Sequence, residues 1–222
     1  MITVHYLEDS RAQRILWMLE ELGLSYEVQV YMRDKSTNLA DPALREVHPL
    51  GRSPVLTDGE ITIAESGAII EHLGHTYGEG ALVPRDPEAL RDYRYWLHFA
   101  EGSMMPPLTV KRAFQVAHSK IPKLVRPLLM AVPNKLDQAY FGRVNRDNIA
   151  HVERYLEGRE YFAGDALSGA DVMMSFPLEA LSSRVSGLKM DHIKAFVKRV
   201  HARPAYQRAL DAAKIPYAYA SR

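Results

Sequence analysis

The chain has 222 residues, of which 47% are hydrophobic and 25% are charged, a profile typical of a folded protein with one large or two small domains. Its 28 lysines and arginines nearly balance its 27 aspartates and glutamates, so the formal net charge is only +1. This balance argues against a broad phosphate-neutralising surface, and we do not expect nucleic acid as a partner. The absence of cysteine excludes disulfides, thiolate metal sites and a cysteine nucleophile, so any sulfur chemistry must use the sulfur of a ligand.

The amino-terminal segment MITVHYLEDSR has no basic region followed by an apolar stretch and a cleavage site, as a secretory leader would. No apolar run approaches the roughly 18 residues that a membrane span needs. We therefore expect a cytoplasmic protein that does not associate with a membrane.

The first third of the chain has the pattern of a strand, a helix and a second strand. Residues 2–7 and 26–31 are short β-type runs, and residues 10–22 between them have the apolar spacing of a helix. Ser10 and Gln13 match the S-x-x-Q capping box that begins many helices. Strand, helix and strand of this length predict a parallel pair with a right-handed crossover.

A hairpin and a helix follow. Residues 41–47 predict a short helix, and the runs 54–57 and 60–63 flank Asp58-Gly59, a strong hairpin signal. Residues 66–77 then predict a further helix. The order β-α-β-α-β-β-α indicates an α/β domain with a small mixed sheet.

After residue 80 the strand signals stop and helical patterns take over, which predicts an all-α second domain. We expect domains at 1–79 and 88–222, joined by a linker at 80–87. Pro106-Pro107 should end the first long helix, and Ser168 with Asp171 forms a capping box for a later one. The expected helices cover residues 91–105, 108–118, 122–132, 134–158, 168–181, 192–201 and 204–213.

Ser10 lies where the first strand leads into the first helix. The free amides and the positive dipole end of a helix favour an anion there, and a serine hydroxyl could lower the pKa of a bound thiol by donating to its thiolate. The alternative is that Ser10 only caps the helix, and spacing alone favours that alternative.

Two further segments could bind an extended peptide-like ligand. Ser53-Pro54 begins a strand after a polar loop, and a cis-proline turn there would offer backbone groups to such a ligand, although an ordinary trans turn is the commoner case. Glu65 and Ser66 lie at a strand-to-helix corner, where they could hold the ammonium and carboxylate of an amino-acid head group. The alternative for this pair is a capping serine beside a solvated glutamate.

Together these segments resemble the glutathione S-transferase superfamily. Ser10 after the first strand, the loop GRSPVL with Pro54, the Glu65-Ser66 corner and SGAD at 168–171 occur in the family's order and span essentially the whole chain. The stretch HYLEDSRAQRILWMLEELGLSYE is particularly similar to bacterial and fungal members. The resemblance implies a thioredoxin-like glutathione-binding domain followed by a helical domain.

The resemblance also implies roles for individual residues. Ser10 is expected to stabilise the glutathione thiolate, with Arg11 as an electrostatic supplement, and Tyr6 is the competing hydroxyl. The main chain of Ser53, beside a cis Pro54, is expected to pair with the cysteinyl part of glutathione. The γ-glutamyl head would lie at Glu65 and Ser66, and the glycyl carboxylate at Arg52 or Arg45, with Arg52 preferred.

A hydrophobic electrophile is expected against the helical domain, in a pocket that includes Tyr6, Phe99, Ser103, Met104 and Pro107. The alternative for the last four is packing in the core or at an interface. His72 and His75 lie three residues apart, but no third ligand is evident, so we expect no metal site. Glutathione is thus expected as a co-substrate, without a prosthetic group, in a homodimer.

The sequence leaves alternative functions open. The same site could reduce peroxides or disulfides with glutathione, without a protein thiol. Alternatively, the fold could serve as a non-catalytic binding or interaction module, because the presence of binding residues does not establish turnover.

Overall fold

The computed structural model describes residues 1–78, 80–184 and 187–220, and it places all four described strands in the first third of the chain. Strands β1 (Ile2–Leu7), β2 (Tyr26–Tyr31), β3 (Val55–Asp58) and β4 (Ile61–Ala64) form one sheet in the order β2-β1-β3-β4. The β1–β2 pair is parallel and the other two pairs are antiparallel, which confirms the predicted mixed sheet. Helix α1 (Ala12–Glu21) makes the crossover between β1 and β2.

The two faces of the sheet are covered by different helices, because side chains alternate along a strand. Ile2, Val4 and Tyr6 of β1 pack into the main core, to which α1 and α3 (Ser66–Thr76) contribute. Leu7, on the other face, packs with Leu44 of the short helix α2 (Leu44–Val47).

Two local predictions need correction. The hairpin pairs Asp58 with Ile61, so its two-residue loop is Gly59-Glu60 rather than Asp58-Gly59; Gly59 takes the positive φ of 59° that the turn requires. The capping box at α1 does not form. The Ser10 hydroxyl does accept from the backbone N–H of Ala12, but the side-chain oxygen of Gln13 accepts from the Tyr6 hydroxyl instead of reaching back to the serine.

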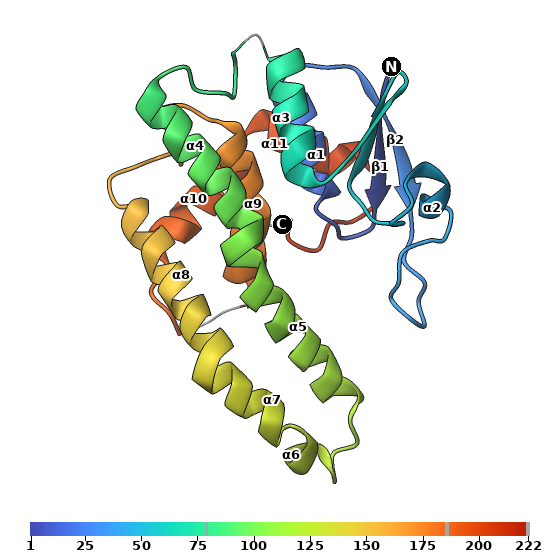
Figure 1. The fold of residues 1–222 in the computed structure, drawn as a ribbon, viewed down its shortest axis with the longest axis vertical. Helices are drawn as coiled ribbons and strands as arrows, with labels where there is room; N and C mark the ends of the chain where they lie inside the picture. Colours follow the sequence, from blue (N-terminus) through green and yellow to red (C-terminus); the bar gives the residue numbers. More distant parts are fainter. Residues whose placement is uncertain (79, 185–186, 221–222) are drawn as a thin grey trace.

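The rest of the described chain is helical (Figure 1). The first of these helices begins at Pro87, four residues before the predicted start at residue 91, because Asp86 caps it by accepting from the amides of Glu88 and Ala89. The helices are α4 (Pro87–Phe99), α5 (Met105–Lys120), α6 (Arg126–Leu129), α7 (Ala131–Leu136), α8 (Gly142–Tyr155), α9 (Gly169–Arg184), α10 (Asp191–His201) and α11 (Pro204–Ala212), with π-helical turns at Ala100–Met104 and Asp137–Phe141.

The prediction that Pro106-Pro107 ends a helix is wrong. The π-turn η1 (Ala100–Met104) joins α4 directly to α5, and the two prolines occupy the first turn of α5. A proline is tolerated there because the first-turn N–H groups are not needed within the helix.

Helix α9 lies at the centre of the helical domain, and half of its predicted capping box forms, because the Ser168 hydroxyl donates to the Asp171 side chain and does not accept from the Asp171 amide. The Asp171 carboxylate accepts from both the amide and the hydroxyl of Ser168, and from the amide of Phe162. Helix α1 of the first domain packs against α9 and α11, and Trp17 makes an edge contact with Tyr206 at 5.6 Å between ring centroids. The two halves therefore share one continuous core.

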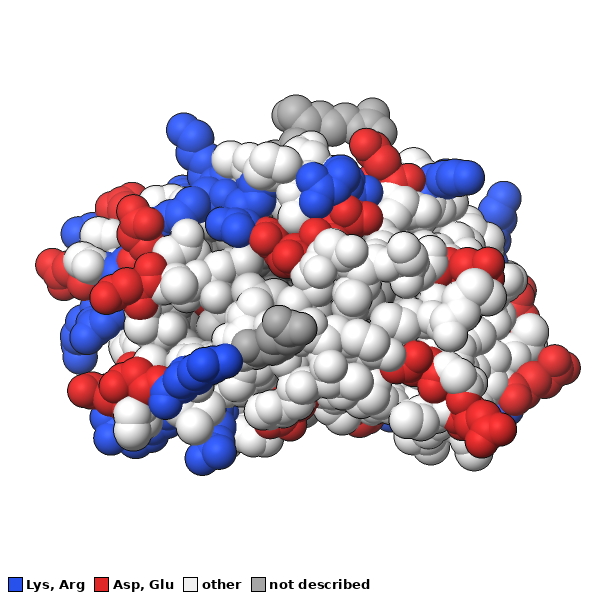
Figure 2. Space-filling model, turned by 90° about the horizontal axis from the view of Figure 1, so that it is seen from above, with Lys and Arg blue, Asp and Glu red and all other residues white. Residues whose placement is uncertain are grey.

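Helices α5, α7 and α8 form a long arm whose end, at α6, lies far from the sheet (Figure 1). Figure 2 shows one face of the molecule, where charged side chains of both signs mix on the left, acidic ones predominate at the lower right, and uncharged residues fill most of the middle. Within residues 1–78, 80–184 and 187–220, no helix is long and apolar enough to cross a membrane.

Candidate active site

A pocket of about 210 Å³ lies where the β1–α1 turn, the loop before β3 and the start of α3 meet the π-turn η1. Most of the predicted glutathione-site residues line it. Its lining residues are Arg11, His48, Leu50, Arg52, Ser53, Pro54, Ala64, Glu65, Ser66 and Glu101.

Ser10 lies beside this pocket and is held by backbone and side-chain contacts. Its side chain is almost fully buried, and its Oγ lies 3.2 Å from the Ala12 N–H and 3.3 Å from the Ser53 Oγ. The Ser53 hydroxyl already donates to the carbonyl oxygen of His5 at 2.9 Å, so its one proton is committed. The Ser10 hydroxyl is therefore the donor between the two serines, and its proton is available to a stronger acceptor.

Ser53 connects the pocket to the sheet. Besides its bond to His5, its Oγ accepts from the Leu7 N–H at 3.1 Å, which joins the loop to the end of β1. The Ser53-Pro54 peptide bond is cis, as predicted. The loop is thus fixed on β1, directly beside Ser10.

Glu65 and Ser66 form the corner between β4 and α3. Glu65 has a φ of 73°, a left-handed conformation unusual for a residue with a side chain. Its carboxylate is exposed, whereas Ser66, the first residue of α3, is buried. This arrangement places a carboxylate and the free amides of a helix N-terminus on the same pocket, so it can accept a cation and an anion that lie close together.

Glu101 joins the two domains at the edge of the pocket. It lies in the π-turn η1, and its carboxylate pairs with Arg11 at 3.0 Å and with Arg14. Arg14 is buried, and its Nη1 also donates to the carbonyl oxygen of Met173 at 2.8 Å. Both guanidinium groups lie over the ring of Phe176, at 5.6 and 5.8 Å.

The ionised form of Glu101 is favoured by this arrangement. Burial by itself would raise the pKa of Glu101, but the guanidinium groups of Arg14 and Arg11 lower the pKa by more than burial raises it. The pKa of Glu101 therefore lies below its usual value. Burial lowers the pKa of Arg14, while Glu101 opposes that shift. A carboxylate shared by two arginines therefore joins α1 to the helical domain.

Four of the pocket residues, His48, Leu50, Ala64 and Glu101, were not among the predicted site residues. His48 and Leu50 belong to the loop that precedes Arg52, and no motif in the sequence distinguishes them from other loop residues. Glu101 is brought to the pocket by a π-turn, and such turns occur often at functional sites. No period in the sequence predicts where an extra helical residue is inserted.

Ser10 borders the pocket without lining it, and several other predicted residues lie away from it. Tyr6 points into the core, where its hydroxyl donates to Gln13 and burial raises its pKa, the opposite of what an activating hydroxyl needs. Arg45 is turned aside, because its Nη1 donates to the carbonyl oxygen of Pro49 at 3.1 Å. Among the residues expected at the electrophile, the side chains of Phe99, Met104 and Pro107 are buried and only that of Ser103 is half-exposed.

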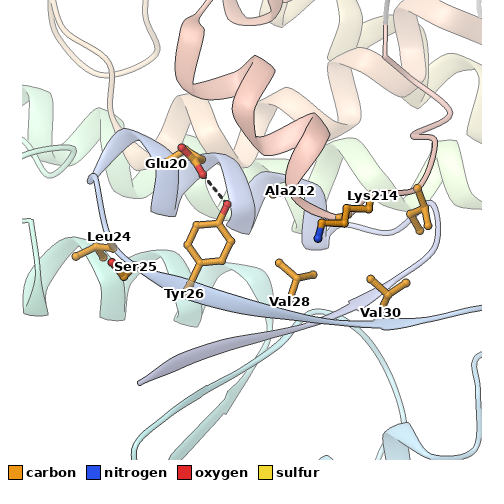
Figure 3. A pocket seen from close by; sticks show the side chains of 10 residues that line it. Glu20, Leu24, Ser25, Tyr26, Val28, Val30, Ala212 and Lys214 are labelled. Atoms are coloured by element: carbon orange, nitrogen blue, oxygen red, sulfur yellow. Dashed lines mark hydrogen bonds between the residues drawn. The ribbon is translucent and has the colours of Figure 1, made fainter.

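A larger hollow, of about 670 Å³, lies over the edge strand β2 (Figure 3). Tyr26, Val28 and Val30 form its floor, and Lys214 with Ile215, after α11, lies across from them. The Tyr26 hydroxyl donates to Glu20 at 2.7 Å. No predicted site residue lines this hollow, so it is separate from the pocket beside Ser10.

Two family models match the chain. Residues 1–75 match the N-terminal domain of glutathione S-transferase, and residues 133–204 match its C-terminal domain. The first match covers the sheet-containing half, and the second lies within the helical half, which begins at Pro87.

Whole-length relatives agree with these matches. The chain is 35% identical to glutathione S-transferase 3 of Schizosaccharomyces pombe, covering 92% of this chain and 85% of the relative. It is 33% identical to glutathione S-transferase 1 of Saccharomyces cerevisiae, covering 96% of both. Its fold superposes on a glutathione S-transferase crystal structure from Actinobacillus pleuropneumoniae with a TM-score of 0.82 and 30% identity, covering 100% of this chain and 97% of the other. The chain belongs to the glutathione S-transferase family.

Proposed function

We propose that the protein binds glutathione in the pocket beside Ser10, ionises its thiol there and transfers the sulfur to a hydrophobic electrophile. The observation that carries this proposal is the meeting of Ser10, the cis Ser53-Pro54 turn and the Glu65-Ser66 corner around one pocket. These segments are far apart in the sequence, and each suits a different part of glutathione.

The γ-glutamyl head would lie at the corner of β4 and α3. Its ammonium would pair with the exposed Glu65 carboxylate, and its carboxylate would accept hydrogen bonds from the first-turn amides of α3 and from the Ser66 hydroxyl. The main chain of Ser53 would pair with the cysteinyl unit as an edge strand does. Arg52, which is exposed and lines the pocket, is the cation for the glycyl carboxylate.

The thiol would be ionised at Ser10. The Ser10 proton, now donated to the neutral Ser53 hydroxyl, would turn to the thiolate, since a charged acceptor forms the stronger bond. Arg11, at the same pocket, adds positive potential and lowers the thiol pKa. The thiolate then attacks the electrophilic carbon, a carbon–sulfur bond forms and the leaving group departs with the bonding electron pair; the thiol proton goes to solvent.

The electrophile would approach from the side of the helical domain, near the π-turn that carries Ser103. Phe99, Met104 and Pro107 would support this surface from beneath, because their side chains are buried. Tyr6 would contribute only to the packing under the site.

The proposal includes the wider setting expected from the resemblance. We infer a cytoplasmic enzyme with domains at 1–79 and 88–222, a division supported by the end of α3 at Thr76 and the beginning of α4 at Pro87. We also infer a homodimer with a role in detoxification. Light scattering at micromolar protein should give the mass of two chains, and a monomer would contradict this part of the proposal.

A Ser10→Ala variant tests the proposed chemistry. We expect turnover of an aryl halide to fall roughly ten- to a hundredfold, as for the loss of one hydrogen bond to a charged group, while the affinity for glutathione stays close to that of the unchanged protein. Ser119→Ala is the matched control, because the Ser119 hydroxyl is exposed on α5 and donates to the carbonyl oxygen of Val116 in the same helix. Unchanged turnover in Ser10→Ala would remove Ser10 from the mechanism.

A further inference from the structure

The segment that follows α11 runs back from the sheet side of the molecule towards α9 (Figure 1). It begins at Lys214, whose φ of 55° reverses the chain direction, and passes the hollow over β2 (Figure 3). We call residues 214–220 the tail. Three separate contacts attach it to the core and to the elements that carry Ser10 and Arg11.

The first contact anchors the tail in the core. The Tyr217 side chain is buried, and its hydroxyl donates to Glu179 Oε2 of α9 at 2.8 Å. Glu179 is itself buried, and its other oxygen accepts from Tyr206 of α11 at 2.9 Å. Two tyrosines on different segments therefore make the same kind of bond to one carboxylate, but only Tyr217 belongs to the tail.

The second contact attaches the tail to the turn that carries Ser10. The backbone N–H of Ala218 donates to Asp9 Oδ1 at 2.8 Å. Asp9 precedes Ser10 directly and has a φ of 48°, a left-handed conformation that aspartate adopts more readily than most residues. A bond from the tail thus holds the side chain of the residue that directly precedes Ser10 and has this left-handed backbone conformation.

The third contact reaches Arg11 through aromatic rings. Tyr219 packs edge-on against Phe176 of α9, with ring centroids 5.6 Å apart. The Arg11 guanidinium also contacts Phe176, 5.6 Å from the ring centroid. Both residues that we assign to the thiolate, Ser10 and Arg11, are therefore in indirect contact with the tail.

We infer that the tail positions the thiolate-stabilising turn, with Asp9 and Tyr217 as the positioning residues. The Tyr217 anchor fixes the tail on α9, the tail fixes Asp9, and Asp9 fixes the direction of the Ser10 hydroxyl towards the sulfur. This inference rests on the proposed function. The inference extends the proposed function by assigning roles to Asp9 and Tyr217, which do not line the glutathione pocket.

The direct readout is the pKa of the thiol of bound glutathione, followed by the ultraviolet absorbance of the thiolate as pH is varied, with glutathione alone and no electrophile present. Because no electrophile is present, a direct contact between the tail and an electrophile cannot change the measured thiol pKa. Turnover of an aryl halide, separated into kcat and KM, is the second readout.

Two pairs of variants separate positioning from other effects. Asp9→Ala removes the acceptor of the Ala218 N–H, whereas Asp9→Asn keeps an oxygen in the same place without the charge. Tyr217→Phe and Tyr206→Phe each remove one hydroxyl bond to Glu179, but only the first loosens the tail. Asp9 is exposed, so its variants should fold even where a buried tyrosine variant does not.

We expect Asp9→Ala and Tyr217→Phe each to raise the bound-thiol pKa by about half to one unit and to lower kcat roughly three- to tenfold, the equilibrium effect of one hydrogen bond. The KM for glutathione should change less than twofold, and Asp9→Asn and Tyr206→Phe should retain the original thiol pKa. The inference is overturned if Asp9→Ala leaves the thiol pKa and kcat unchanged, if Asp9→Asn behaves like Asp9→Ala, or if Tyr206→Phe behaves like Tyr217→Phe. Absence of any thiolate signal with the unchanged protein would instead contradict the proposed function, and this inference with it.

Discussion

The ion pair between Glu101 and the buried Arg14 makes a quantitative prediction about stability. The Arg14 side chain is 1% exposed and that of Glu101 is 34% exposed. Replacing Glu101 with Gln leaves a buried guanidinium with no counter-charge, which costs about 3–5 kcal/mol for a fully buried pair. The cost here should be smaller, about 2 kcal/mol, because water reaches Glu101, the amide oxygen can still accept, and Met173 continues to accept from Arg14.

The assay is thermal unfolding followed by circular dichroism at fixed protein concentration. For a chain of this size, about 2 kcal/mol corresponds to a decrease in Tm of roughly 4–8 °C. The matched control is Glu88→Gln, which removes the same charge from a pair with Arg91 whose side chains are 80% and 71% exposed. That surface pair should contribute less than about 0.5 kcal/mol, a change in Tm of at most about 2 °C. Equal effects of the two substitutions, or an unchanged Tm in Glu101→Gln, would refute the reasoning.

Two further predictions concern stability and pH. Asp171→Ala leaves three buried donors without an acceptor and should lower the free energy of unfolding in urea by about 3 kcal/mol or more. Asp86→Ala, which removes an exposed helix cap, should lower it by about 1 kcal/mol. Equal losses in the two variants would contradict the view that burial makes the Asp171 bonds more important. Burial lowers the pKa of His5 from its ordinary value of 6.5, so below pH 6.5 the unfolded chain takes up a proton that the folded chain does not. The His5 contribution to stability is therefore complete above pH 6.5 and is lost as pH falls below it, with a slope of at most about 1.4 kcal/mol per pH unit. The difference in unfolding free energy between the unchanged protein and His5→Gln should show this slope between pH 6.5 and 5, and a flat difference would contradict it.

Most of the first domain could be predicted because its patterns are local. The strands at 2–7 and 26–31 alternate apolar and polar residues, and both were predicted with the bounds that the structure has. The hairpin shifted by one residue, since a two-residue loop at either position leaves the same alternation on the strands. Pro106-Pro107 was misjudged because proline interrupts a helix only beyond its first turn, and sequence alone does not show where that turn begins.

The candidate site was predictable where a residue type is tied to one backbone position. Ser10 at a strand end, Pro54 at a strand start and Ser66 at a helix start are of this kind, and the structure brings the three segments together. The contacts between Arg14 and Glu101 and between Ala218 and Asp9 were not predictable. They join positions 87 and 209 residues apart, and nothing in the sequence around either pair distinguishes it from other helix or loop residues. Tyr6 was a candidate only because it is near Ser10 in sequence, and the alternation along β1 turns it into the core.

The central claim is that the pocket beside Ser10 binds glutathione. Isothermal titration of the pure protein with reduced glutathione near neutral pH tests it most directly. We expect saturable binding with one site per chain, and weaker binding in a variant such as Ser66→Ala, which removes a hydroxyl from the proposed γ-glutamyl site. No heat of binding up to several millimolar glutathione would contradict the account and would favour a non-catalytic interaction module on the same fold.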